Sequence, residues 1–160
     1  MGPDFQYINL RKFQRVVCEV SLSFRIIDYK GGMPLTQPAK TKLATLEFQG
    51  HARDISAGGL YFSVLDQKVS VSPPGGHGGE FSLGQALESG SLLEMKIILP
   101  DEEKPVSCMA MAKILRVAHL SEASGSAKEP FCRVGAAFLA IDSEDRHRLM
   151  KFCIANQEPS

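Results

Sequence analysis

The chain has 160 residues, 44% of them hydrophobic, which is the size and apolar content of one compact domain with a hydrophobic core. Lysine plus arginine and aspartate plus glutamate number 18 each, so the net charge is zero and no general field favours DNA, RNA or an anionic membrane. The sequence contains no apolar run of the roughly 18 residues that a membrane span needs, and its start lacks the features of a signal peptide. We therefore expect a cytoplasmic protein without membrane insertion.

The first half of the chain predicts three strands. Val16–Ile27 alternates loosely and is rich in β-branched and aromatic residues, which favours a strand. Glycine and proline then interrupt the pattern, and we interpret residues 31–43 as an extra loop. Further strands are predicted over Ala44–Ala52 and Gly59–Val64, so the residues from Asp54 onward should form the turn between them.

Residues 67–89 are predicted to form a mobile surface loop, because the glycine- and proline-rich run at 73–79 disfavours regular structure. A glycine run can also cradle a phosphate group. However, neither a Lys-Ser nor a Lys-Thr pair follows this one, and the sequence after it does not indicate a helix. The loop interpretation is therefore preferred.

The remainder of the chain predicts more strands and one helix. Strands are expected over Leu92–Leu99, Val106–Ala118 and Phe131–Ile141. The acidic and hydroxyl residues at 142–145 suit the start of a helix, and the apolar side chains that follow, from Leu149 to Ile154, give that helix a buried face. Five or six strands with short turns favour a closed or nearly closed antiparallel barrel, because closure hides the sheet edges.

Two short motifs carry most of the information about function. Arg11 and Arg15 form an RxxxR pair, which is weak evidence alone because roughly 0.4 such pairs are expected by chance in a chain of this composition. Asp54, Ser56 and Gly59 form a DxSxxG string, of which only about 0.06 are expected by chance. The order of the two motifs, with the arginine pair first, and the predicted strands and helix that follow them restrict the families that the chain can resemble.

In this order the motifs resemble the two-part ligand signature of PilZ domains, and the resemblance covers roughly residues 8–155. It implies a mainly β fold, a six-stranded antiparallel β-barrel with a C-terminal α-helix, which agrees with the strand pattern. It also implies a receptor whose ligand is cyclic di-GMP, without a cofactor. The ligand-binding residues that the resemblance assigns are Arg11, Arg15, Asp54, Ser56 and Gly59.

The chemistry of these residue types fits that ligand. A guanidinium group can bond a phosphate bidentately, span O6 and N7 of guanine, or stack on a purine face. Asp54 can accept hydrogen bonds from N1 and N2 of guanine, and Ser56 can donate and accept beside it. Gly58 and Gly59 permit positive φ and a close approach of backbone to ligand. Leu10, just before the arginine pair, adds no further guanidinium, which favours one ligand per chain.

We expect residues 1–15 to be a flexible segment carrying the arginine pair, and residues 16–156 to be a single PilZ-type domain. Ligand binding would order the segment over the DxSxxG turn. The sequence shows no acid/base pair, nucleophile constellation or metal cluster, so we do not expect an enzyme. The signal would then pass to an unidentified effector protein.

Three further residues have open interpretations. Arg53 precedes the turn and could support a phosphate, although a surface cation at a strand end explains it equally well. Arg116 lies in a strand whose outward face needs polar residues, so a surface role is favoured. Gly135 matches a position where PilZ domains place a small residue near the ligand, or it eases the curvature of the barrel.

The cysteines and histidines give no metal prediction. Cys18, Cys108, Cys132 and Cys153 lie among apolar neighbours without a CxxC motif, so they are expected to be buried, reduced thiols. The four histidines share no spacing with each other or with the cysteines that is typical of a zinc site.

Two other functional classes fit the sequence less well. A nucleotide-independent PilZ-like adaptor would act through protein–protein contacts in motility, pilus or polysaccharide assembly. Such an adaptor is expected to lack some of the ligand-binding signature residues, whereas this chain has all five of them. An RNA-binding barrel needs a basic face with interleaved aromatic residues. The chain has no tryptophan and 8% aromatic residues, so neither DNA nor RNA is expected as a partner.

Overall fold

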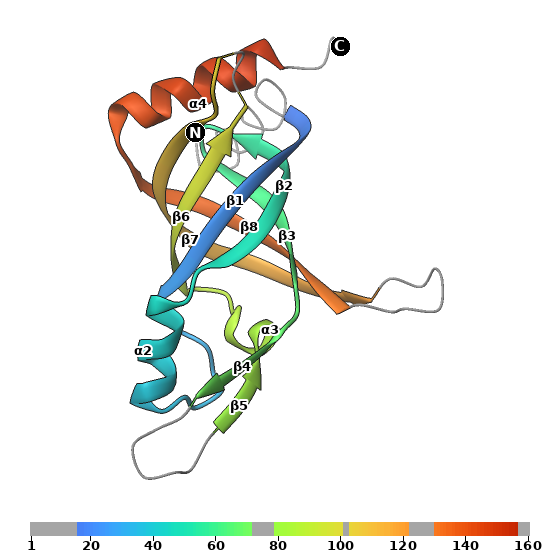
Figure 1. Ribbon diagram of the computed structural model, residues 1–160, viewed down its shortest axis with the longest axis vertical. Coiled ribbons are helices and arrows are strands. Elements are labelled where there is room, and N and C mark those ends of the chain that lie inside the picture. The colour runs from blue at the N-terminus through green and yellow to red at the C-terminus, as the bar shows by residue number, and fades with distance from the viewer. Residues whose placement is uncertain (1–15, 72–78, 101–102, 122–129, 157–160) are drawn as a thin grey trace, which may run out of the picture.

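The computed structural model describes residues 16–71, 79–100, 103–121 and 130–156, and it is built around a closed barrel (Figure 1). The strands follow one another around the barrel in the order β1, β2, β3, β8, β7, β6, and each neighbouring pair is antiparallel. The barrel strands are β1 (Val16–Asp28), β2 (Phe48–Ser56), β3 (Gly59–Leu65), β6 (Leu92–Leu99), β7 (Val106–Ser121) and β8 (Pro130–Ile141).

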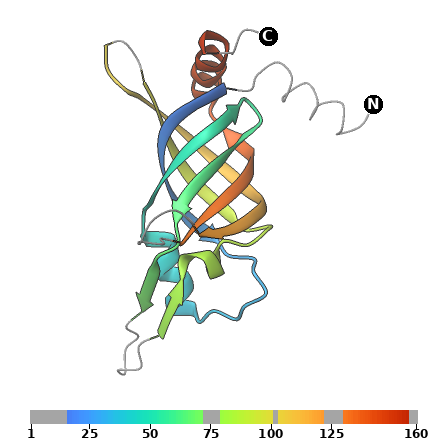
Figure 2. The same ribbon diagram turned by 90° about the vertical axis from the view of Figure 1, so that its right-hand side faces the viewer.

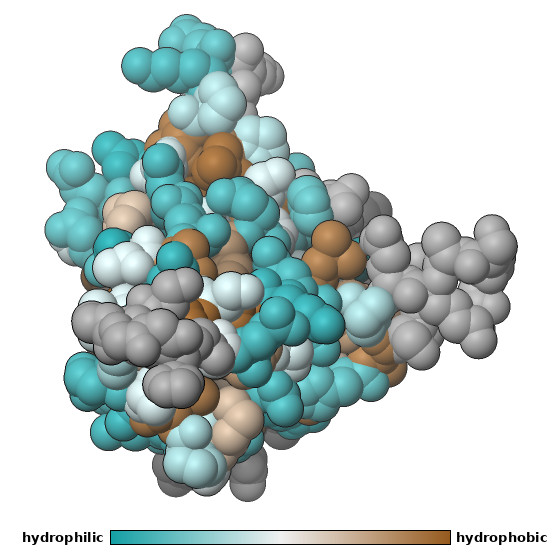
Figure 3. Space-filling model, turned by 60° about the horizontal axis from the view of Figure 1, so that its bottom comes forward, coloured by the Kyte–Doolittle hydropathy of each residue, from teal (hydrophilic) through white to brown (hydrophobic). Residues whose placement is uncertain are grey.

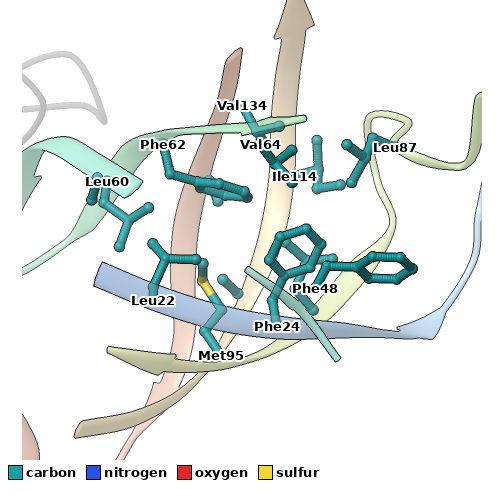
Figure 4. Packing of buried hydrophobic residues seen from close by; sticks show 14 of the residues in the cluster. Leu22, Phe24, Phe48, Leu60, Phe62, Val64, Leu87, Met95, Ile114 and Val134 are labelled. Carbon is teal, nitrogen blue, oxygen red and sulfur yellow. The ribbon is translucent and has the colours of Figure 1, made fainter. Parts of the chain in front are cut away.

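Alternation of buried and solvent-facing residues along the strands creates the barrel interior. In β3, Leu60, Phe62 and Val64 are buried while the residues between them lie on the outer surface. The ring of Phe24 lies 5.2 Å from that of Phe62 and 5.6 Å from that of Phe48, centroid to centroid, at the centre of the core (Figure 4). The predicted mainly β barrel is therefore confirmed.

The helix α4 (Ser143–Ala155) covers one end of the barrel (Figures 1 and 2). Asp142 caps it, because its carboxylate accepts a hydrogen bond from the backbone nitrogen of Glu144 at 3.1 Å. The buried face of α4 consists of Leu149, Phe152 and Cys153. The predicted C-terminal helix and its acidic start are both confirmed.

The opposite end of the barrel carries a smaller unit, which we call the cap (Figures 1 and 2). The cap contains α2 (Gln37–Thr45), α3 (Leu83–Ala86) and a two-stranded sheet of β4 (Lys68–Val71) and β5 (Gly79–Ser82). Leu43, Leu83 and Leu87 are completely or almost completely buried, and Leu87 points into the barrel core (Figure 4). Seen from this end, apolar side chains form separate patches among hydrophilic ones (Figure 3).

The cap corrects three sequence predictions. Residues 31–43 are not simply a loop, because α2 begins after Thr36, whose hydroxyl accepts a hydrogen bond from the backbone nitrogen of Ala39. Pro38 lies in the first turn of that helix, where proline is tolerated, so it does not interrupt the helix. The strand predicted from Ala44 therefore begins only at Phe48. Nor is 67–89 wholly irregular, since β4, β5 and α3 lie within it.

Candidate functional site

The DxSxxG string forms the turn between β2 and β3. Ser56, the last residue of β2, pairs with Gly59, the first residue of β3. The Ser56 hydroxyl accepts a hydrogen bond from the backbone nitrogen of Gly58 at 3.2 Å and donates one to the carbonyl oxygen of Gly59 at 3.3 Å. Ser56 therefore organises the turn, and its oxygen retains a second acceptor position.

Asp54 lies beside a β-bulge. The pairing of β2 with β3 passes from Ala52 opposite Phe62 to Asp54 opposite Tyr61, which leaves Arg53 as the extra residue. A bulge redirects the side chains next to it. Arg53 is exposed and Asp54 is half-buried, and both line the same hollow on the barrel surface.

Gly59 is needed because a neighbouring strand is close. A Cβ atom at this position would lie 2.3 Å from the carbonyl oxygen of Ala136 in β8. The turn is tied to the same strand by a 2.9 Å hydrogen bond from the backbone nitrogen of Phe138 to the carbonyl oxygen of Gly58. The positive φ that Gly58 and Gly59 permit is not adopted, since Gly90 is the only residue with positive φ in the described ranges.

The hollow lies on the outer face of the barrel and has a volume of about 720 Å³, within the size range of small-molecule sites. Its lining includes a row across three strands, because Tyr61 of β3 and Arg116 of β7 both pair with Gly135 of β8. A Cβ atom at Gly135 would lie 2.7 Å from the Tyr61 ring and 3.3 Å from Cγ of Arg116. The absent side chain lets the ring and the arginine stem lie over β8.

Three arginines border this hollow. Arg53, Arg116 and Arg133 are all exposed, and none of them makes an ion pair with another residue in the described part of the chain. Asp54 supplies the one carboxylate among the lining residues. A chain with no net charge therefore has a locally basic hollow, which suits an anionic ligand.

Arg11 and Arg15 lie outside the described residues, but the start of β1 lies next to the DxSxxG turn. Val16 pairs with Ile55, and Val17 pairs with Asp54. Val16 directly follows Arg15 in the sequence. The DxSxxG turn therefore lies beside the first described residue after the arginine pair.

Sequence reasoning missed Tyr61 and Arg133 as site residues. Each lies two positions from a glycine that it considered, Tyr61 after Gly59 and Arg133 before Gly135. Alternate residues of a strand share one face, so this spacing was a usable signal once the strands had been placed. Gly135 and Arg116, which had open interpretations, also line the hollow.

Cys108, Cys132 and Cys153 are buried thiols, as expected. Burial, followed by the nearby Asp145 carboxylate, raises the pKa of Cys108 to about 11. The Cys153 thiol donates to the carbonyl oxygen of Ile55 at 3.7 Å, which places α4 against the strand that carries Asp54. The side chain of Cys18 lies outside the described part of the chain.

Comparison with known protein families matches residues 9–155 to the PilZ domain. The chain belongs to the PilZ domain family. The match to PilZ begins before β1 and ends with the last residue of α4, so it takes in the whole barrel and its helix. No curated protein matches the chain in sequence.

Solved structures show the same PilZ fold. The Bacillus subtilis inhibitor of motility, MotI/DgrA, is 19% identical with a TM-score of 0.56, and the match covers 92% of this chain and 51% of that one. The PilZ domain of YcgR from Escherichia coli, solved with c-di-GMP, is 10% identical with a TM-score of 0.55, over 92% and 91%. MrkH of K. pneumonia, described as a c-di-GMP-dependent transcription regulatory factor, is 12% identical with a TM-score of 0.51, over 88% and 48%.

The chain spans about half the length of the MotI/DgrA and MrkH chains and nearly all of the YcgR PilZ domain. Among the described residues, the PilZ domain has no helix with the length and apolar character needed to cross a membrane.

Proposed function

We propose that this PilZ domain is a cytoplasmic, non-catalytic receptor for cyclic di-GMP. The observation that carries the proposal is the pairing of Val16 and Val17 with Ile55 and Asp54. It brings the residue that follows Arg15 to the rim of a basic hollow whose wall contains the DxSxxG turn. The YcgR PilZ domain, which was solved with c-di-GMP, supports the proposal through its shared fold.

The two arginines outside the described ranges would make the strongest contacts. The guanidinium groups of Arg11 and Arg15 would bond the phosphates and the Hoogsteen edges of guanine, which lysine could not do with the same two-point geometry. Asp54 would accept hydrogen bonds from N1 and N2 of one guanine. The second acceptor position of the Ser56 hydroxyl would face the ligand beside it.

The floor of the hollow would hold a base. Tyr61 offers an aromatic face, and Arg116 lies on the other side of Gly135 in the same cross-strand row. Bases stack on such faces with about 1–3 kcal/mol each. Arg53 and Arg133, at the border of the hollow, would add electrostatic attraction for the phosphates.

The signal would arise from ordering of residues 1–15 over the turn, while residues 16–156 act as one domain that holds the site. Ordering costs conformational entropy, which the charge-assisted contacts of Arg11 and Arg15 would offset. The ordered segment would then present a new surface to a separate effector protein. In this proposal neither DNA, RNA nor a membrane is the partner.

Isothermal titration calorimetry with cyclic di-GMP tests the receptor proposal, with GMP and cyclic di-AMP as controls. We expect saturable binding of cyclic di-GMP at one ligand per chain and weaker binding of both controls. Absence of heat together with an unchanged melting temperature would contradict it. That result would favour the nucleotide-independent adaptor that acts through protein contacts in motility, pilus or polysaccharide assembly.

A further inference from the structure

Three potential metal ligands meet where the barrel joins the cap, away from the hollow. Asp66 directly follows β3, His119 lies on β7 and Cys132 on β8. His119 is directly opposite Cys132, and Cys132 is opposite Val64, two residues before Asp66. One ligand atom from each of the three side chains lies within 4.8 Å of the other two. Neighbouring strands therefore bring together residues that are far apart in the sequence.

The distances suit a tetrahedral ion. Sγ of Cys132 lies 3.5 Å from Nδ1 of His119. Zinc binds thiolate sulfur at about 2.3 Å and imidazole nitrogen at about 2.0 Å, so two such ligands at a tetrahedral angle are about 3.5 Å apart. The pair therefore already has the separation that a shared zinc ion requires.

We propose that Asp66, His119 and Cys132 form a binding site for a divalent metal ion of zinc type. Thiolate, imidazole and carboxylate are the three donor classes that protein zinc sites use, and the mixture disfavours magnesium and calcium, which take oxygen ligands. Three protein ligands leave a fourth position. A cavity lined by His119, Gly84 and Gln85 adjoins the cluster, so water can occupy that position.

The carboxylate is held in place by the cap. The backbone nitrogen of Gly84, in α3, donates a hydrogen bond to Oδ1 of Asp66 at 2.8 Å. A Cβ atom at Gly84 would lie 2.7 Å from Oδ2 of the same carboxylate, so glycine permits this approach. Hydrogen bonds of this kind orient metal ligands and are worth about 10- to 100-fold in affinity.

A bound ion would join four parts of the fold. It would link the ends of β3, β7 and β8 directly, and α3 through the Gly84 hydrogen bond to Asp66. The Cys132 side chain is fully buried. Zinc binds the thiolate form of cysteine, so the ion must displace the thiol proton when it binds. The ion would stabilise the junction between barrel and cap.

Cysteine and histidine spacing carries no metal prediction, and the strand pairing explains why spacing alone could not reveal the proposed site. His119 and Cys132 are 13 residues apart, without a recognisable motif. They become neighbours only through the β7–β8 pairing, and the third ligand comes from the end of β3.

Titration of the full chain with zinc chloride under reducing conditions, by calorimetry and by thermal melting, tests the site. We expect one zinc ion per chain. At a free zinc concentration 100-fold above Kd, the melting temperature should rise by about 5–10 °C. Cobalt(II) should give the thiolate-to-metal charge-transfer band and the intense visible bands of a tetrahedral site.

Variants locate the ion. His119→Gln and Cys132→Ala should each weaken zinc binding at least about tenfold, and Cys132→Ala should abolish the cobalt charge-transfer band. His147→Gln and Cys108→Ala are matched controls, an exposed histidine on α4 and a buried thiol on β7, and both should bind zinc as the wild type does. Because His119 is exposed, its variant remains informative even if Cys132→Ala fails to fold. A wild-type chain without saturable binding, or a His119→Gln variant with unchanged affinity, would overturn the proposal.

Discussion

The neighbouring strand, rather than the backbone angle of the turn, determines the residue at position 59. The Gly59 backbone packs against the Ala136 carbonyl, and this contact holds the DxSxxG turn at the edge of the hollow. Backbone atoms cannot move aside as a flexible side chain can. A methyl group at position 59 must therefore separate β3 from β8 or distort the turn.

Gly59→Ala should lower the free energy of unfolding by about 1–3 kcal/mol, the usual cost of overpacking a tight contact. Urea denaturation followed by circular dichroism measures the change. Gly79→Ala in β5 is the control, because a Cβ atom there meets nothing within 4 Å, and it should change stability by no more than about 0.5 kcal/mol. Equal stability of the Gly59→Ala variant and the wild type would show that the turn does not depend on this contact.

Arg15→Ala should weaken cyclic di-GMP binding by at least about 2 kcal/mol, roughly 30-fold in Kd, because charge-assisted contacts are lost. Calorimetry measures the affinity, and the melting temperature without ligand should stay unchanged. Arg146→Ala, which removes an exposed arginine from α4, is the charge-matched control. If Arg15→Ala binds as tightly as that control does, Arg15 is not part of the site.

Tyr61 should contribute through its ring. Tyr61→Leu should cost about 1–3 kcal/mol of cyclic di-GMP affinity, the range for loss of base stacking on an aromatic face. Tyr61→Phe keeps the ring and should bind nearly as the wild type does. Calorimetry on both variants separates stacking from hydrogen bonding, and a larger loss in Tyr61→Phe than in Tyr61→Leu would contradict a stacking role.

At the scale of elements, two hydrogen bonds join α4 to β7. The Asp145 carboxylate accepts a hydrogen bond from the backbone nitrogen of Met109 at 3.0 Å and pairs with Arg148 at 2.8 Å. The Cys108 thiol donates to the carbonyl oxygen of Asp145 at 3.6 Å. A buried thiol next to a carboxylate is stable only while it keeps its proton.

This junction predicts a pH dependence of stability. Burial and Asp145 raise the pKa of Cys108 from 9.0 to about 11 in the folded state. Below pH 9 the thiol is protonated in both states, and its contribution to stability is complete. Between pH 9 and about 11 the unfolded chain loses the proton first, so stability falls by up to about 1.4 kcal/mol per pH unit. Urea denaturation of the wild type and of Cys108→Ala at pH 8 and pH 10.5 gives the difference in their free energies of unfolding at each pH. A difference that is the same at both pH values would contradict the prediction.

Sequence reasoning succeeded for elements whose local pattern was periodic and failed where short signals competed. The strand Leu92–Leu99 was predicted with the observed bounds, because its buried and outward-facing residues alternate regularly along the barrel wall. The helix α2 was missed because Pro38 was interpreted as a break, whereas Thr36 makes it part of a helix start. The β4–β5 pair was missed because four-residue strands carry almost no periodic signal.

At the scale of the whole molecule, the motif order could be read from the sequence, but the walls of the hollow could not. DxSxxG is a local string, so its turn was predictable from its neighbours. Arg116 and Tyr61 lie 55 positions apart, and only the register of β8 against both of their strands brings them together at Gly135. The same dependence on register hid the Asp66, His119 and Cys132 cluster. Long-range pairing thus determines everything in the site beyond the signature itself.

A closed barrel is too rigid for a ligand to change the shape of the barrel much. The signal of ligand binding must therefore act on segments outside the barrel. The strand β1 begins at Val16, directly before the residue that pairs with Asp54, and trypsin can cleave after Arg11, Lys12 and Arg15 in residues 1–15. If cyclic di-GMP orders the segment, only the unbound chains are cleaved there. At a ligand concentration tenfold above Kd about one chain in eleven is unbound, so cleavage at these sites should slow about tenfold. Mass spectrometry of the released peptides measures the rate.

Cleavage elsewhere in the chain provides the internal reference, since sites away from the segment should be cut at rates that the ligand barely changes. Asp54→Ala removes a guanine contact without altering residues 1–15, so at the same ligand concentration it should restore most of the rapid cleavage. GMP should not protect. Unchanged cleavage of the wild type at a ligand concentration that saturates the calorimetric signal would mean that the ligand binds without ordering the segment. The signal would then have to leave through another contact of the hollow, such as the end of α4 that is bonded to Ile55.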